Sequence, residues 1–200
     1  DSITEDPPVT DPICLVTVDS TGFNRIVWTK AGVHIAFYNI YRETGNSGNF
    51  LQLGTVYYAD ESSFLDTFSN PAAKSWRYKL GVVDSCGNES AFLSPMHKTI
   101  YLNLYQAGPG IVLVWDPYYG FYYNDIVIYR GTAPDSLFPL DTIPVGGNSY
   151  FDSNPPQSVL VYYNIAAIHP DGCTALKLKT YNASKSNTAA TQSPTRITKN

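Results

Sequence analysis

Charged residues are scarce in this chain and make up 15% of its 200 residues, against about 25% in an average globular protein. The net charge of -4 offers no basic surface of the kind that nucleic acid requires. No apolar run approaches the roughly 18 residues of a membrane span, and the acidic N-terminus, DSITEDPPVTDP, lacks the form of a signal peptide. We therefore expect neither nucleic-acid binding nor membrane insertion.

Residues with catalytic or metal-binding spacing are also lacking. The three cysteines and three histidines form no CxxC motif and no cluster with ligand spacing. There is no Gly-rich phosphate loop and no G-x-S-x-G motif. The acidic residues do not follow the pattern of a calcium loop, and a small sandwich offers no cleft for a pair of catalytic acids. We expect no enzyme activity, no metal and no cofactor.

Aromatic residues are abundant, at 14% with 16 Tyr, and they suit the half-buried surface of a β-sheet. The segment RYKLGVVDSCGNES shows the pattern most clearly. Tyr78, Leu80 and Val82 alternate along one strand, and Gly87-Asn88 supplies a tight turn.

The chain contains two copies of one unit. Trp28, Arg42, Asp66 and Tyr78 recur as Trp115, Arg130, Asp152 and Tyr163, at offsets of 87, 88, 86 and 85 residues. Such a regular offset indicates an internal duplication.

Each copy divides into short extended runs separated by turn residues, which predicts an all-β fold of two tandem seven-stranded antiparallel β-sandwiches. The expected strands of the first copy are 13–18, 25–29, 37–43, 50–57, 63–68, 76–84 and 92–100. Those of the second are 99–105, 111–115, 125–129, 137–143, 149–152, 159–168 and 175–181.

The predicted organisation is a linker over residues 1–10, a first domain over 11–98, a second over 99–181 and a flexible tail over 182–200. The last strand of the first unit runs almost directly into the first strand of the second. We therefore expect a stiff, elongated pair. The linker-like composition of both ends further predicts that the pair is a piece of a longer secreted chain.

These motifs resemble fibronectin type III domains. The resemblance rests on the Trp of the second strand, Y-x-I-Y-R on the third, F-x-D and the segment VVDSCGNES. It implies that Tyr78 and its counterpart Tyr163 are "tyrosine corners" whose hydroxyls bond backbone just upstream. Tandem units of this kind are similar to regions of large exported proteins of the Bacteroidota, which implies a secreted or cell-surface location.

In this sandwich topology, Cys14 and Cys86 lie at the same pole. We expect a disulfide between them in preference to two separate thiols, because the composition is that of an extracellular protein. Cys173 is then left as an incidental thiol.

An aromatic segment, Tyr118-Tyr119-Gly120-Phe121-Tyr122-Tyr123, is expected in the loop between the second and third strands of the second unit. Its rings could stack on a sugar or anchor a protein partner. Alternatively, they could fill the seam between the domains. We favour the second interpretation.

The function predicted from the sequence is that of a non-catalytic tandem module, a rigid spacer or adhesion segment of an exported surface protein. The alternative is a carbohydrate-binding accessory module of a secreted polysaccharide-degrading enzyme. The expected partners are other domains of the same parent chain, with a surface protein or a glycan as further ligand, and the expected state is a monomer.

Overall fold

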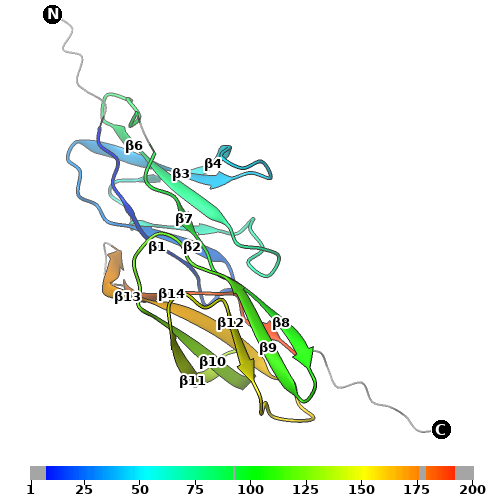
Figure 1. Ribbon diagram of the computed structural model, residues 1–200. Helices are drawn as coiled ribbons and strands as arrows, with labels where there is room; N and C mark the ends of the chain where they lie inside the picture. The colour runs from blue at the N-terminus through cyan, green and yellow to red at the C-terminus, as the bar shows by residue number, and fades with distance from the viewer. Residues whose placement is uncertain (1–7, 92, 176–178, 192–200) are drawn as a thin grey trace, which may run out of the picture.

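The computed structural model describes residues 8–91, 93–175 and 179–191. Its regular elements in these ranges are all β-strands, and they form two sandwiches arranged end to end (Figure 1). No helix that could cross a membrane occurs in this part of the chain.

The first sandwich packs a three-stranded sheet against a four-stranded sheet. The first sheet has the order β1–β2–β5 and the second the order β4–β3–β6–β7, with antiparallel neighbours throughout. The strands are β1 (Ile13–Val18), β2 (Asn24–Trp28), β3 (Ile35–Glu43), β4 (Phe50–Tyr57), β5 (Ser63–Asp66), β6 (Arg77–Asp84) and β7 (His97–Lys98).

The second sandwich repeats this arrangement. Its sheets have the orders β12–β9–β8 and β11–β10–β13–β14, and β15 also pairs with β13. The strands are β8 (Tyr101–Ala107), β9 (Gly110–Asp116), β10 (Asp125–Ala133), β11 (Ser136–Pro144), β12 (Ser149–Asp152), β13 (Tyr162–Ala175), β14 (Lys179–Lys185) and β15 (Ala189–Ala190). The same strand order in both copies confirms the predicted fold class of antiparallel β-sandwiches.

The final strand of each copy differs from its prediction. In the first copy, β7 is the only strand among the described residues of the stretch expected over 92–100, because side chains take over half of the backbone ladder before it. The hydroxyls of Ser90 and Ser94 accept hydrogen bonds from the backbone N–H groups of Val82 and Leu80. In the second copy, the hydroxyl of Ser186 accepts a hydrogen bond from the backbone N–H of Ile165.

The tail predicted over 182–200 begins too early. β14 continues to Lys185, and β15 pairs with Tyr162 and Tyr163 of β13. The stretch to residue 190 therefore belongs to the second sandwich, because it supplies the last strand of its sheet. The rest of the predicted tail, 192–200, lies outside the described residues, as does most of the predicted N-terminal linker.

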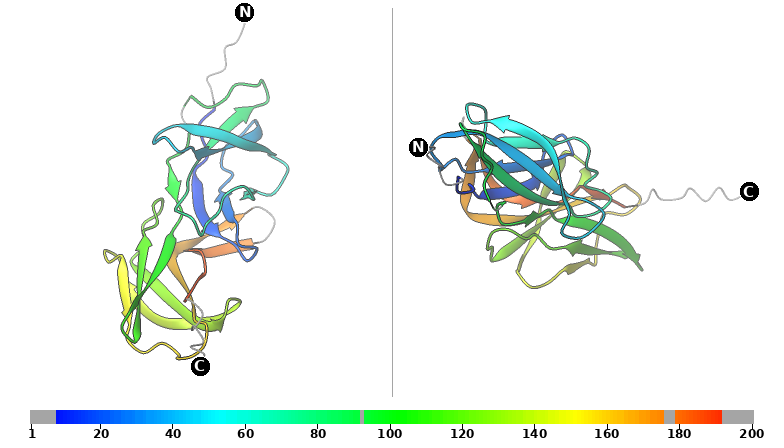
Figure 2. Two further views of the ribbon diagram at one scale, coloured as in Figure 1. Left: turned by 90° about the vertical axis from the view of Figure 1, so that its right-hand side faces the viewer. Right: turned by 90° about the horizontal axis from the view of Figure 1, so that it is seen from above.

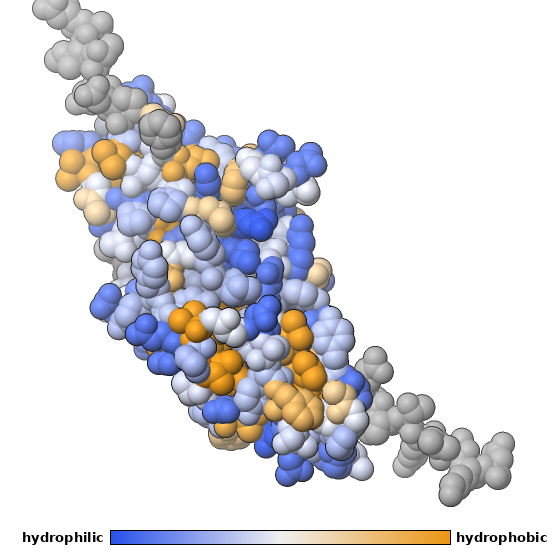
Figure 3. All heavy atoms as spheres, viewed as in Figure 1, coloured by the Kyte–Doolittle hydropathy of each residue, from blue (hydrophilic) through white to orange (hydrophobic). Residues whose placement is uncertain are grey.

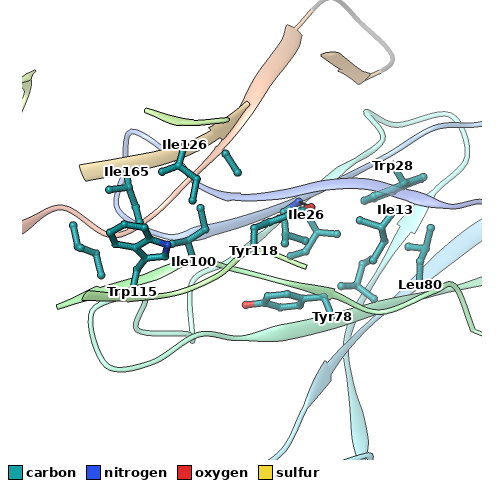
Figure 4. Close-up of a cluster of buried hydrophobic side chains, with 14 of the residues drawn as sticks. Ile13, Ile26, Trp28, Tyr78, Leu80, Ile100, Trp115, Tyr118, Ile126 and Ile165 are labelled. Carbon is teal, nitrogen blue, oxygen red and sulfur yellow. Dashed lines mark hydrogen bonds between the residues drawn. The ribbon is translucent and has the colours of Figure 1, made fainter. Parts of the chain in front are cut away.

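A single cluster of contacting, buried apolar side chains runs through both sandwiches. Trp28 and Leu80 lie in the first half of this core, and Trp115 and Ile165 in the second (Figure 4). Only Thr99 and Ile100 separate β7 from β8, and both are buried. The two cores are thus joined without an exposed linker.

The repeated landmarks of the sequence meet inside each sandwich. In the first, Tyr78 donates a hydrogen bond to Asp66 Oδ2 at 2.8 Å, and Arg42 donates to the same oxygen at 2.7 Å. In the second, the hydroxyl of Tyr163 and the guanidinium of Arg130 each lie 2.7 Å from Asp152 Oδ2.

This geometry corrects the expectation that the two tyrosines bond to backbone. Each hydroxyl instead donates a hydrogen bond to a buried carboxylate, because a buried charge is stable only when it is paired and hydrogen-bonded. Burial works to raise the pKa of Asp152, but the hydrogen bonds from Arg130 and Tyr163 outweigh it and hold that pKa below its usual value.

Candidate functional site: the junction between the sandwiches

A disulfide joins the two sandwiches. It pairs Cys14 of β1 with Cys173 of β13, 159 residues apart in sequence, with the Cα atoms 5.9 Å apart. The predicted Cys14–Cys86 disulfide is therefore wrong, and Cys173 is not an incidental thiol. Cys86 lies exposed in the turn after β6.

Two irregularities bring the cysteines together. The pairing of β1 with β2 slips between Ile13 and Leu15, so that Cys14 is the extra residue of a β-bulge. Bulges of this kind re-aim a side chain. On β13 the pairing with β14 slips between Ile168 and Cys173. The strand thus passes beyond the second sandwich before it reaches Cys173.

The extended β13–β14 hairpin, which we call the clasp (residues 168–175 and 179–184), lies against the first sandwich. Figure 2 shows it beside β1, in orange next to dark blue. Leu15 and Val27, on the outer face of the β1–β2 sheet, are fully buried in a small cluster with residues of the clasp. The clasp residues of this cluster are Cys173, Ala175 and Tyr181.

Polar contacts hold the clasp alongside β1. The hydroxyl of Ser184 donates to the carbonyl oxygen of Val16 at 2.6 Å, and the Lys185 N–H donates to the hydroxyl of Thr17 at 2.9 Å. Ser184 is fully buried, so its hydrogen bond is shielded from competition by water. Loss of such a contact leaves a buried polar group unsatisfied, which costs about 1–3 kcal/mol.

The aromatic segment divides into buried and exposed rings. Tyr118 is 5% exposed, and Phe121 and Tyr123 pack against the core. Tyr119 is 60% exposed and Tyr122 97%. The segment thus contributes three rings to the seam and presents two to solvent.

Tyr118 is the central side chain of the seam and lies between the groups around Trp28 and Trp115 (Figure 4). Its hydroxyl accepts a long hydrogen bond of 3.4 Å from the Val16 N–H and shares one of 2.7 Å with His97 Nδ1. Burial raises the pKa of Tyr118, so the hydroxyl keeps its proton.

The two histidines of the seam are held neutral. Burial, with a smaller contribution from His169, lowers the pKa of His97 to about 4. Burial also lowers the pKa of His169, whose ring lies 4.4 Å from that of Phe121. A protonated His97 ring would need a counter-charge, and its aromatic neighbours supply none. At His169, the negative charge of Asp171 opposes the shift but does not outweigh burial.

The backbone closes one side of the junction. Lys98 and Tyr119 exchange two backbone hydrogen bonds, of 2.7 and 3.2 Å, so the aromatic segment extends the edge of the first sandwich. Gly120 follows with φ of 151°, and a Cβ there would lie 2.2 Å from the His97 ring. Only glycine fits this position. Lys98 also pairs with Asp116 of the second sandwich at 3.2 Å.

On another side of the junction lies an open groove of about 710 Å³. The first sandwich contributes Thr21 and Asn70 to its walls, and the second contributes Asp135 and Lys185. The lining mixes charges of both signs with amides and hydroxyls. No group of three or more metal-ligating side chains occurs here or elsewhere in the described ranges.

Sequence reasoning missed Cys173, Leu15 and Val27 as junction residues. A signal was present in the continuous apolar runs of β1 and β2. An outer strand of an isolated sandwich alternates apolar and polar residues, whereas a strand that is buried on both faces does not. The runs Ile13–Val16 and Ile26–Trp28 are of the second kind, since the clasp covers their outer face.

Comparisons with known proteins return structures but no family. No family model matches the chain, and no curated protein matches it. One similar structure is a pectate lyase from Erwinia chrysanthemi in complex with tetragalacturonic acid, with 17% identity and a TM-score of 0.39. The match covers 46% of this chain and 28% of that one.

Two further structures match over most of the chain. The central fibronectin-III array of RIM-binding protein has 11% identity and a TM-score of 0.35, with 92% of this chain and 69% of that chain covered. Chicken CNTN1 FN1–FN3 has 12% identity and a TM-score of 0.37, with coverage of 95% and 68%. These are likenesses to fibronectin III arrays, at low identity.

Proposed function

We propose that this chain is a non-catalytic spacer, a stiff pair of sandwiches that holds neighbouring parts of an exported protein at a fixed separation. The observation that carries the proposal is the Cys14–Cys173 disulfide, which connects the two sandwiches covalently. An exported setting agrees with it, because disulfides persist mainly in oxidising compartments.

Stiffness follows from the number of independent contacts at the junction. The disulfide, the buried cluster under the clasp, the Ser184–Val16 hydrogen bond and the Lys98–Tyr119 bridge lie at different points around it. A hinge motion would have to break several of them together. Domains joined by flexible linkers lack such constraints and reorient freely.

A non-catalytic role is supported by the partners of the two buried acids that the duplication repeats. Asp66 and Asp152 are each neutralised by an arginine and a tyrosine within the same sandwich. On the face seen in Figure 3, apolar side chains occur in small groups separated by polar ones. Such a surface is sufficient for a spacer, which has to bind no substrate.

Small-angle X-ray scattering tests the proposal. The wild-type chain should fit one elongated monomer, with the same radius of gyration at all salt concentrations. Cys86→Ser is the matched control and should scatter identically. If the wild-type data require an ensemble of freely oriented sandwiches, the spacer proposal is wrong.

A second candidate function is binding of a carbohydrate or protein ligand through the exposed rings of Tyr119 and Tyr122. Flat rings held on a loop can stack on sugar rings. A glycan array should then show binding that is lost when both residues are changed to alanine. Phe68→Ala, at a ring that is 87% exposed on the first sandwich, should leave it intact. Absence of binding to every glycan removes this candidate for sugars.

A further inference from the structure

The cysteines of the junction bracket almost the whole of both sandwiches. Residues 15–172 lie between them and include every strand from β2 to β12. Outside the bracket lie the chain before Cys14 and the chain after Cys173, which contains β14 and β15. The disulfide therefore connects the N-terminal segment directly to the C-terminal segment.

We infer that this disulfide lets the pair of sandwiches carry tension between the two ends of the chain without being unfolded by it. When the chain is pulled through its two ends and the segments outside the bracket have peeled away, tension passes from Cys14 across the sulfur–sulfur bond to Cys173, and residues 15–172 carry none of it. This deepens the proposed spacer function and rests on it for its biological setting. It concerns the path of force, whereas the spacer proposal concerns orientation.

The disulfide lies between the two ends through which the chain would be pulled. The first described residues lie at one end of the first sandwich, and the last described residues lie on the second sandwich (Figure 1). The disulfide sits between them at the junction. Without it, a pull on the ends would load both sandwiches in series, and each would have to resist through hydrogen bonds and packing alone.

The segments outside the bracket can still peel away. β14 and β15 pair with β13, and Asp11 holds the N-terminal segment through hydrogen bonds to Tyr38 and to the backbone of Gly32. Once these contacts break, only residues 1–13 and 174–200 can straighten. At about 3.4 Å per residue, their full length is about 140 Å. The bracketed residues would add roughly 540 Å if they were released.

Single-molecule force spectroscopy on the full chain, with handles at both ends, distinguishes the two cases. In oxidising buffer the wild-type chain should lengthen by no more than about 140 Å before the handles detach. With a phosphine reductant, or in the double variant C14S/C173S, a further release of roughly 540 Å should follow, because both sandwiches then unfold under load. Cys86→Ser should behave like the oxidised wild type.

Two results would overturn the inference. The first is release of the full length by the oxidised chain. The second is a non-reducing peptide map of the same material without a linked Cys14–Cys173 pair. Failure of the spacer proposal is separate, since it would appear as flexible scattering in a chain that still resists extension.

Discussion

Cys14 and Cys173 lie with their Cα atoms 5.9 Å apart although 159 residues separate them in the chain. The two residues belong to different sandwiches, so their bond fixes tertiary arrangement rather than the fold of either unit. The surrounding clasp buries apolar side chains that a single sandwich would expose. The junction is therefore part of the hydrophobic core and not a linker.

Removal of the disulfide should destabilise the whole chain. In the chain-entropy treatment, a closed loop of this length stabilises the native state by about 5 kcal/mol. We expect C14S/C173S to lower the free energy of unfolding by up to that amount, measured by chemical denaturation with tryptophan fluorescence. Cys86→Ser should change it by less than about 0.5 kcal/mol. Equal stability of the double variant and the wild type would contradict this expectation.

Gly120→Ala should disrupt the seam. The new Cβ would lie within 2.2–2.6 Å of three atoms of the His97 ring, and φ at this position is 151°, which side chains rarely adopt. A destabilisation of at least about 2 kcal/mol is expected in thermal or chemical unfolding.

Gly147→Ala is the matched control for this change, because a Cβ at Gly147 meets nothing within 4 Å. In addition, Gly120→Ala combined with His97→Ala should cost less than the sum of the single variants, since the clash is then relieved. Strict additivity would show that the ring is not the obstacle.

The stability of the chain should fall as the pH drops from about 6.5 to about 4. His97 has a pKa of about 4 in the folded protein and an ordinary value of 6.5 when unfolded. The unfolded state therefore takes up the proton first, and folding loses up to about 3 kcal/mol across this window. Above pH 6.5 the contribution is fully present.

The measurement is the free energy of unfolding at several pH values for the wild type and for His97→Gln. Carboxylates also titrate near the lower limit, so the relevant quantity is the difference between the two proteins. We expect that difference to change by about 3 kcal/mol over the window. A difference that is independent of pH would show that His97 does not remain neutral in the seam.

Tyr78→Phe and Tyr163→Phe should each weaken their sandwich, and Tyr78→Phe should cost more, because the Tyr78 hydroxyl also accepts a hydrogen bond from buried Asn24. Each change removes a hydrogen bond to a buried carboxylate while the arginine remains. Hydrogen bonds to charged groups contribute about 1.5–3 kcal/mol. Tyr119→Phe, at an exposed ring, should be neutral in the same denaturation experiment. A neutral result for either buried tyrosine would mean that solvent replaces the lost donor.

The landmarks that revealed the duplication are the residues that build the interior of each copy. Trp28 and Trp115 fill the two halves of the core, and Asp66 and Asp152 are the buried acids that hold an arginine and a tyrosine. Their spacing could be read from the sequence because each lies on a strand, and the alternation of side chains along a strand depends only on neighbouring residues. The strands over 13–18, 50–57 and 149–152 were predicted with the bounds that the structure has.

The sequence by itself determined the class of the fold, the duplication and the short connection at Thr99 and Ile100, since these depend on alternation, turns and repeats along the chain. Only the tertiary structure decided the partner of Cys14. The choice depended on a bulge that turns its side chain outward and on a hairpin that extends past its own sandwich. Contacts between surfaces that are distant in sequence leave no periodic pattern, and so no local signal fixes them.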